Sequence, residues 1–212
     1  EDSFGCVASI SGKGLKDLVI NYPFVFEVIE IEEIKGDISD SDEITTSGLI
    51  IQPPTEDSIE VSVIDSGIME GNKYLSASIK SQNSQSFIKD DNSTMDMVAG
   101  GGHGTKVAGA ILYPNGISNL NTPYTLPFYI RNIRILNNEN KLESKYPASL
   151  MKQIVEKNSD CSIFNLSVST SKPFNKKHMS SWAAILDKLT FENNVLFVVS
   201  VGNCLLYTSD AA

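Results

Sequence analysis

Long hydrophobic runs, cysteine pairs and an excess of positive charge are all missing from this sequence of 212 residues. No apolar run approaches the roughly 20 residues that cross a bilayer, so the sequence predicts no membrane partner. Lysine and arginine number 17 against 26 acidic residues, and this net charge of −9 argues against a nucleic-acid partner. With 41% hydrophobic and 20% charged residues, the chain nevertheless has enough apolar surface for a sizeable core.

The cysteines are too few and too scattered to organise a fold. Cys6, Cys161 and Cys204 are an odd number without metal-type spacing, so the sequence predicts no disulfide framework. Their scarcity favours a reducing compartment and leans toward the cytoplasm. Because the sequence begins at Glu1, a signal peptide would not be visible, and the location stays undetermined.

The acidity is local. Residues 27–43 hold eight acidic residues and one base, Lys35, whereas residues 44–212 are nearly neutral. We interpret the acidic stretch as a solvated face and linker, because it has no ligand spacing that would support a calcium site or another cofactor. The segment 36–59 is rich in Gly, Ser, Asp, Thr and Pro. We therefore predict an N-terminal appendage with an acidic linker over 1–50 and a main domain over 58–203.

Strand-like and helix-like segments alternate along the main domain. The sequence predicts an α/β fold, a doubly wound and mostly parallel sheet with helices on both faces. The appendage shows a short helical pattern followed by a strand-like run over 24–31. In the main domain we expect strands over 59–64, 129–136 (interrupted by Arg131 and Arg134), 162–168 and 195–201, and helices over 104–112, 148–157 and 179–189.

Polar residues gather where the predicted strands end. Asp65 follows the first strand, Ser167, Val168 and Ser169 end the third, and Asn203 follows the fourth. His103 lies in a glycine cluster at the start of a predicted helix. Because the carboxyl ends of parallel strands meet at one edge of a sheet, we expect an Asp, a His and an Asn to converge there.

Four short motifs, in this order, resemble those of subtilisin-like serine proteases (the subtilase, or peptidase S8, family). They are Val63-Ile64-Asp65-Ser66-Gly67, Gly102-His103-Gly104-Thr105-Lys106-Val107-Ala108-Gly109, Ile163-Phe164-Asn165-Leu166-Ser167 and Val198-Val199-Ser200-Val201-Gly202-Asn203. The resemblance covers about residues 58–203 and implies a serine endopeptidase with a peptide or protein substrate. It implies His103 as the general base, Asp65 as its orienting partner and Asn203 as an oxyanion donor.

The resemblance also implies that Ser167, Val168 and Ser169 pair by their backbone with an extended substrate. The family usually has Gly where Ser169 stands, so a side chain there is expected to reshape the pocket for the residue before the cleaved bond. The glycines around His103 invite a phosphate-loop interpretation, but Thr105 separates Gly104 from Lys106, so the Gly-Lys-Ser/Thr ending is absent.

The family's Gly-Thr-Ser nucleophile motif does not occur in the 212 residues. Thr208-Ser209 is rejected as a match, because Tyr207 stands where the motif has Gly. We therefore expect a C-terminally incomplete fold that is inactive by itself. Residues 204–212 resemble a translated sequencing adapter, and we predict that they are a non-native tail.

One other function stays open at this level. Without a nucleophile in its gene, the same fold would be a non-catalytic peptide-binding protein. Taken by themselves, Asp65 and Asn203 are also open to interpretation as plain turn residues. The sequence does not determine the oligomeric state.

Overall fold

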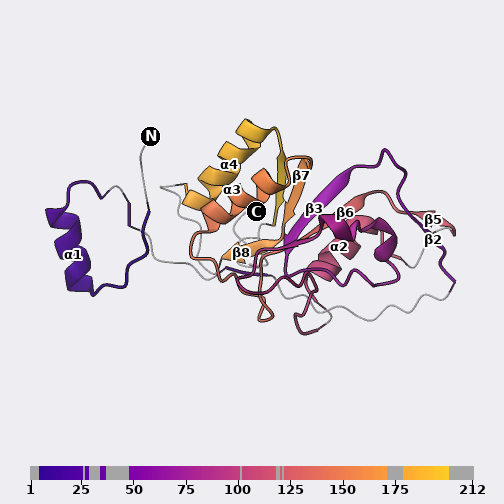
Figure 1. Ribbon diagram of the computed structural model, residues 1–212, viewed down its shortest axis with the longest axis horizontal. Coiled ribbons are helices and arrows are strands. Elements are labelled where there is room, and N and C mark those ends of the chain that lie inside the picture. Colours follow the sequence, from indigo (N-terminus) through magenta and orange to yellow (C-terminus); the bar gives the residue numbers. More distant parts are fainter. Residues whose placement is uncertain are drawn as a thin grey trace, which may run out of the picture. The chain divides into compact units, whose positions relative to one another are not determined.

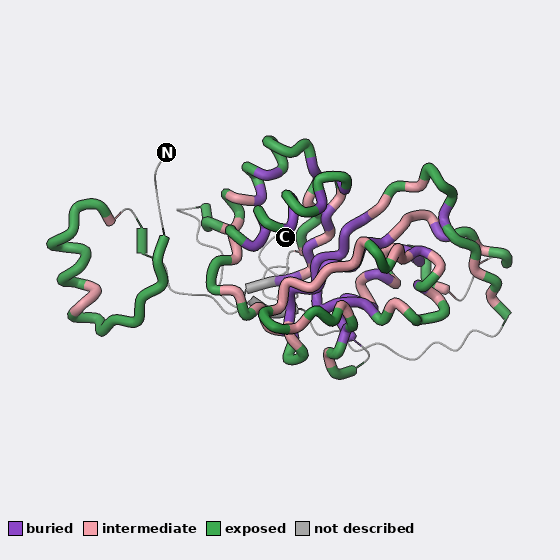
Figure 2. Tube along the Cα trace, viewed as in Figure 1, coloured by how far each residue is buried: buried purple, intermediate pink, exposed green. Residues whose placement is uncertain are grey.

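The computed structural model describes residues 5–25, 27–28, 34–36, 48–100, 102–117, 120, 122–170 and 179–200. The chain divides into two units, Glu1–Glu32 and Glu33–Ala212. The first contains helix α1 (Gly12–Asn21), where the Ser11 hydroxyl caps the helix by accepting the Gly14 N–H at 3.1 Å. No residue of α1 is buried, as Figure 2 shows. In the run predicted as a strand over 24–31, the described residues form none, and the others lie outside the described part.

A five-stranded sheet forms the centre of the second unit (Figure 1). Every described pairing in it is parallel. The fold is therefore the α/β type that the sequence predicts. Three of its strands lie inside the predicted segments, and a fourth, Glu60–Asp65, ends one residue beyond its segment. The spatial order is β4 (Gln85–Ser86), β6 (Tyr129–Arg134), β3 (Glu60–Asp65), β7 (Ile163–Leu166) and β9 (Leu196–Val199).

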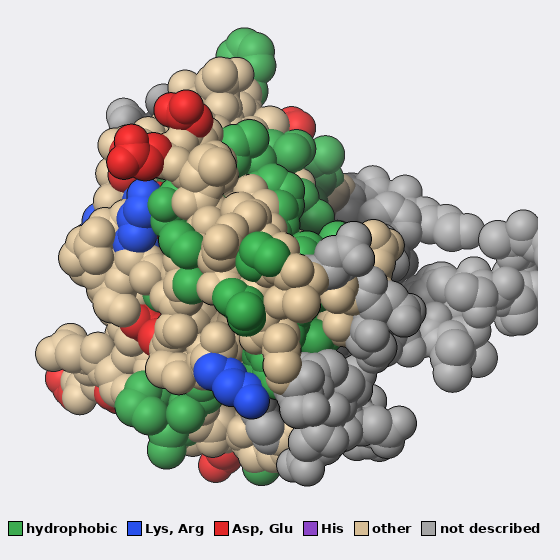
Figure 3. Space-filling view, turned by 90° about the vertical axis from the view of Figure 1, so that its right-hand side faces the viewer, with side chains coloured by type: hydrophobic (Ala, Val, Ile, Leu, Met, Phe, Trp, Pro, Cys, Tyr) green, Lys and Arg blue, Asp and Glu red, His purple; other side chains and the backbone are tan. Residues whose placement is uncertain are grey.

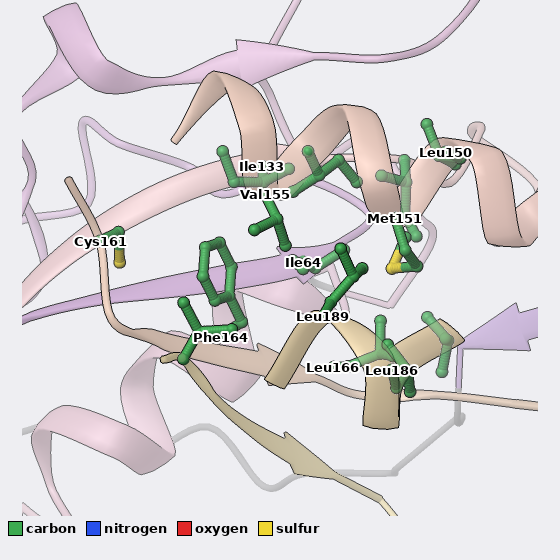
Figure 4. Packing of buried hydrophobic residues seen from close by; sticks show 14 of the residues in the cluster. Ile64, Ile133, Leu150, Met151, Val155, Cys161, Phe164, Leu166, Leu186 and Leu189 are labelled. Atoms are coloured by element: carbon green, nitrogen blue, oxygen red, sulfur yellow. The ribbon is translucent and has the colours of Figure 1, made fainter. Parts of the chain in front are cut away.

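Helices pack on both faces of this sheet, because side chains of a strand alternate between its two sides. On one face, Ile64 and Phe164 pack against α3 (Pro147–Lys157) and α4 (Ser181–Asn193), as Figure 4 shows. On the other face, Val63 belongs to the cluster that contains residues of α2 (Gly104–Leu112). Each buried aliphatic side chain of this kind stabilises the fold by about 1.5–3 kcal/mol.

Local signals place the helices close to where the sequence predicts them. Pro147 occupies the first turn of α3, where its missing N–H is no loss. The Ser180 hydroxyl caps α4 by accepting the Ala183 N–H at 3.1 Å, and Asn194, in the left-handed conformation, ends that helix. Helix α2 has the predicted bounds.

Short strands pair outside the main sheet. β1 (Ile34–Gly36) pairs antiparallel with β8 (Val168–Thr170), and β2 (Ile51–Gln52) pairs parallel with β5 (Tyr124–Thr125). β2 falls in the segment predicted as a linker. Two 3₁₀ turns, η1 (Ser76–Ser78) and η2 (Ser81–Asn83), precede β4.

Figure 3 views the molecule from the side of β2 and β5, where hydrophobic side chains lie among uncharged polar ones and charges of both signs occur. Across the described residues, helices are too short or too polar to span a bilayer.

Candidate active site

Asp65 and His103 come together at the carboxyl end of β3. Asp65 is the last residue of that strand, and His103 immediately precedes helix α2. His103 Nδ1 lies 2.7 Å from Asp65 Oδ1, which is hydrogen-bonding distance. The two residues are 9% and 1% exposed, respectively. The sheet edge therefore brings together two of the residues that the sequence predicts to converge there.

Asp65 is a buried carboxylate with unequal oxygens. Oδ1 accepts the Ser66 N–H at 2.6 Å as well as bonding to His103. Oδ2 is buried and has no hydrogen-bond partner among the described residues. Burial raises the pKa of the Asp65 carboxyl above its ordinary value, and the hydrogen bonds from His103 and Ser66 act in the opposite direction. Such a perturbed group in a polar cluster is typical of functional sites.

The start of α2 lies very close to the end of β3. A methyl group on Gly104 would overlap the Gly67 carbonyl oxygen and would come within 3.0 Å of Asp65 Cβ. Only glycine therefore lets the helix begin near enough for His103 to bond to Asp65. This contact gives the Gly-His-Gly sequence a structural reason that is independent of any family resemblance.

A second acid, Asp96, belongs to the same polar cluster, and the sequence does not predict it. It is 5% exposed, whereas its neighbours Met95 and Met97 are 47% and 54% exposed. One signal was available. Asp96 is the only Asp, Glu, Lys or Arg between Asp91 and Lys106.

The predicted substrate strand is divided in the structure. Ser167 lies between β7 and β8, and its Oγ accepts the side-chain amide of Asn165 at 2.8 Å. Val168 is buried, and Ser169 lies in β8 opposite Lys35 of β1. Asn203, the predicted oxyanion donor, is outside the described residues. The structure therefore brings together Asp65 and His103, and the roles of the other site residues stay predictions.

Metal ligands do not gather in the part of the chain that the structure describes. No group of three His, Cys, Asp or Glu residues there is arranged to hold a metal ion. The free cysteines among these residues, exposed Cys6 and buried Cys161, are far apart in the sequence.

A parallel α/β sheet with a buried, hydrogen-bonded Asp–His pair at its carboxyl edge defines the class of folds that carry acid–base chemistry at strand ends. The comparison with known families is more specific. The sequence model of the subtilase family (peptidase S8) matches residues 56–210, which is most of the chain. The chain belongs to the subtilase family, a family of serine peptidases that act on peptides or proteins. A search of curated proteins finds no match.

Proposed function

We propose that this protein acts as a serine endopeptidase in which Asp65 and His103 activate a serine nucleophile. The observation that carries the proposal is the 2.7 Å hydrogen bond between His103 Nδ1 and Asp65 Oδ1, buried at the carboxyl edge of a parallel sheet. No Gly-Thr-Ser motif occurs in the 212 residues, so the nucleophile is assigned to none of them.

Each proton in the proposed reaction has a defined path. His103 Nε2 takes the proton of the serine hydroxyl while the serine oxygen attacks the peptide carbonyl carbon. The carbon–nitrogen bond then breaks, the leaving amine takes the proton from His103, and an acyl-enzyme remains. In the second half, the same imidazole takes a proton from water, and the water oxygen attacks the acyl carbon. The ester bond then breaks, the acid leaves, and the serine oxygen takes the proton from His103. Asp65 keeps the proton on Nδ1 and stabilises the imidazolium.

The proposed substrate is an extended peptide that pairs with the backbone of β8. Supporting this, β8 already pairs antiparallel with another extended segment, β1 of the same chain. Asn203 is proposed to donate to the oxyanion formed during attack. Ser169, in place of the family's usual Gly, is proposed to narrow the pocket for the residue before the cleaved bond.

A non-catalytic peptide-binding function is the second candidate. The antiparallel pairing of β8 with β1 favours it, because backbone pairing with an extended segment requires no nucleophile. The two candidates share the peptide site at β8 and differ only in whether bound peptide is cleaved.

Hydrolysis and binding of peptides by the intact gene product separate the candidates. Cleavage of an unstructured protein such as casein, abolished by His103→Ala and unchanged by His178→Ala, is expected for the endopeptidase. Peptide binding without cleavage, equal in the wild type and His103→Ala, would establish the second candidate instead. If the protein neither binds nor cleaves peptides, both candidates are contradicted.

A further inference from the structure

Asp96 connects the residues that follow Asp65 and His103 in the sequence. Its carboxylate accepts four hydrogen bonds from neutral donors. Oδ1 accepts the Ser66 hydroxyl at 3.0 Å and the Val98 N–H at 3.3 Å. Oδ2 accepts both the N–H and the hydroxyl of Thr105, at 2.9 and 2.8 Å. The carboxylate therefore uses all of its described bonds to hold other parts of the chain in place.

Two of these partners, Ser66 and Thr105, lie close to the Asp–His pair in the sequence. Ser66 directly follows Asp65, and its Oγ also accepts the Gly104 N–H at 3.0 Å. Thr105 lies two residues after His103, in the first turn of α2. Asp96 and Ser66 thus satisfy two of the N–H groups that the first turn of a helix leaves unpaired. The same bonds fasten the start of α2 to the end of β3.

The backbone next to His103 is shaped around the Asp96 carboxylate. Gly102 has a φ of 80° and packs so close that a Cβ there would overlap Asp96 Oδ2. Any other residue at 102 would displace the carboxylate or the backbone that leads into His103. The backbone that leads into His103 is therefore fixed by its contact with the Asp96 carboxylate.

We propose that Asp96 is a positioning residue, whose carboxylate holds Ser66 and Thr105 so that His103 Nδ1 stays bonded to Asp65. This inference rests on the proposed function of the Asp–His pair. An amide cannot replace the carboxylate, because each oxygen accepts a backbone N–H, from Val98 or from Thr105. Whichever way an Asn side chain is turned, its NH₂ group faces one of these donors.

The proton shared by His103 and Asp65 provides a readout of position that does not depend on activity. In the intact protein, we expect a low-field proton resonance coupled to nitrogen that disappears in His103→Gln. In Asp96→Asn this resonance should move upfield or broaden beyond detection. In Asp90→Asn, which removes one charge from an exposed residue of the same loop, it should stay unchanged. An unchanged resonance in folded Asp96→Asn would overturn the proposal.

Ser66→Ala is the second variant, for the case that Asp96→Asn does not fold. It removes the link to β3 and leaves Asp96 to cap α2, so the fold should persist while the resonance shifts as in Asp96→Asn. A folded Ser66→Ala with the wild-type resonance contradicts the proposal. Thr105→Ser, which keeps the hydroxyl, should retain the wild-type resonance, and Thr105→Val should not. Equal spectra for these two would also contradict it.

Kinetics then separate this inference from the proposed function. In a cleavage assay, Asp96→Asn should lower kcat by about 10- to 100-fold with KM unchanged, because a small misplacement of the base affects the transition state more than binding. A variant with altered KM and unchanged kcat would contradict a positioning role. If the wild type cleaves nothing, the proposed function fails, and the resonance alone still decides whether Asp96 positions His103.

Discussion

Strand β3 carries a carboxylate at each end, and the two carboxylates differ in the partners that they bind. At the amino end, Glu60 Oε2 lies 2.8 Å from Arg131 Nη2, and the same guanidinium binds Asp160 at 2.7 Å. At the carboxyl end, the hydrogen bonds described for Asp65 come from the imidazole of His103 and the Ser66 N–H. The amino end is an ion-pair cluster, and the carboxyl end is a buried acid with one oxygen that has no partner among the described residues.

The pKa directions of Asp160 and Asp65 are opposite. Hydrogen bonding to Arg131 lowers the pKa of the Asp160 carboxyl. Burial raises the pKa of the Asp65 carboxyl. Ionisation of Asp160 is therefore favoured by folding, and ionisation of Asp65 is opposed by it. We interpret the cluster at the amino end as structural. At the carboxyl end, burying Asp65 opposes its ionisation, and we interpret this perturbed group as functional.

The largest expected effect at the carboxyl end is on catalysis. His103→Ala removes the proposed general base, so kcat/KM for peptide hydrolysis should fall by at least about 10²–10⁴-fold. Circular dichroism should show the wild-type fold. If purified His103→Ala hydrolysed peptides as fast as the wild type, the carboxyl end of β3 would have no catalytic role.

The largest expected effect at the amino end is on stability. Arg131 is 3% exposed, and Arg131→Met leaves the mostly buried Glu60 without its cation. We expect the free energy of unfolding in urea to fall by about 3 kcal/mol. Lys152→Met is the matched control, because it breaks an exposed pair with Glu156 and should cost under about 0.5 kcal/mol. Equal losses in the two variants would show that the Arg131 cluster stabilises the fold no more than an exposed ion pair does.

Two glycines of α2 differ in how closely they approach the rest of the chain, and only Gly104 lies against the end of β3. Gly104→Ala should cost about 1–3 kcal/mol, because its methyl group overlaps the Gly67 carbonyl. Gly109→Ala meets nothing within 4 Å and should gain up to about 1 kcal/mol from helix propensity. Thermal unfolding of both variants measures the difference. If Gly104→Ala were as stable as Gly109→Ala, contact between α2 and β3 would not be as tight as described.

The smallest expected effects are opposite pH dependences of stability. Asp65 has a raised native pKa, so its contribution to stability is fully present below about pH 3.9 and is lost as pH rises through the native value. Asp65→Asn should therefore gain stability relative to the wild type as pH rises. Asp160 has a lowered native pKa, so Asp160→Asn should lose stability relative to the wild type over the same rise. Urea unfolding between pH 3 and pH 7 tests both slopes, and slopes of the same sign would contradict the comparison.

Much of this arrangement could be predicted from the sequence, because it depends on local pattern. The glycine cluster and the apolar stripe of 104–112 predict α2, and the rule for parallel strand ends brings Asp65 near His103. The role of Asp96 could not be predicted, because its partners are 30 and 9 residues away and no periodicity links them. The ion pairs of the buried Arg131 and Arg134 could not be predicted either, since strand patterns treat a charge as an interruption.

The pairing of β1 with β8 shows the same limit. A three-residue strand in an acidic stretch has no alternating pattern, and its register with Val168–Thr170 arises only in the folded chain. Gly104 and Gly102 were visible as a cluster, but which carbonyl or carboxylate each one accommodates depends on distant loops.

A fluorophosphonate probe reacts with a serine that a neighbouring base has activated, so its adduct reports on the Asp65–His103 pair. The intact wild-type protein should form one covalent adduct, located by mass spectrometry on a serine, and His103→Ala should form none. His178→Ala, which removes the other histidine of this sequence, should be labelled like the wild type. No adduct on the wild type, or an equal adduct on His103→Ala, would contradict a serine peptidase that works through the Asp65–His103 pair.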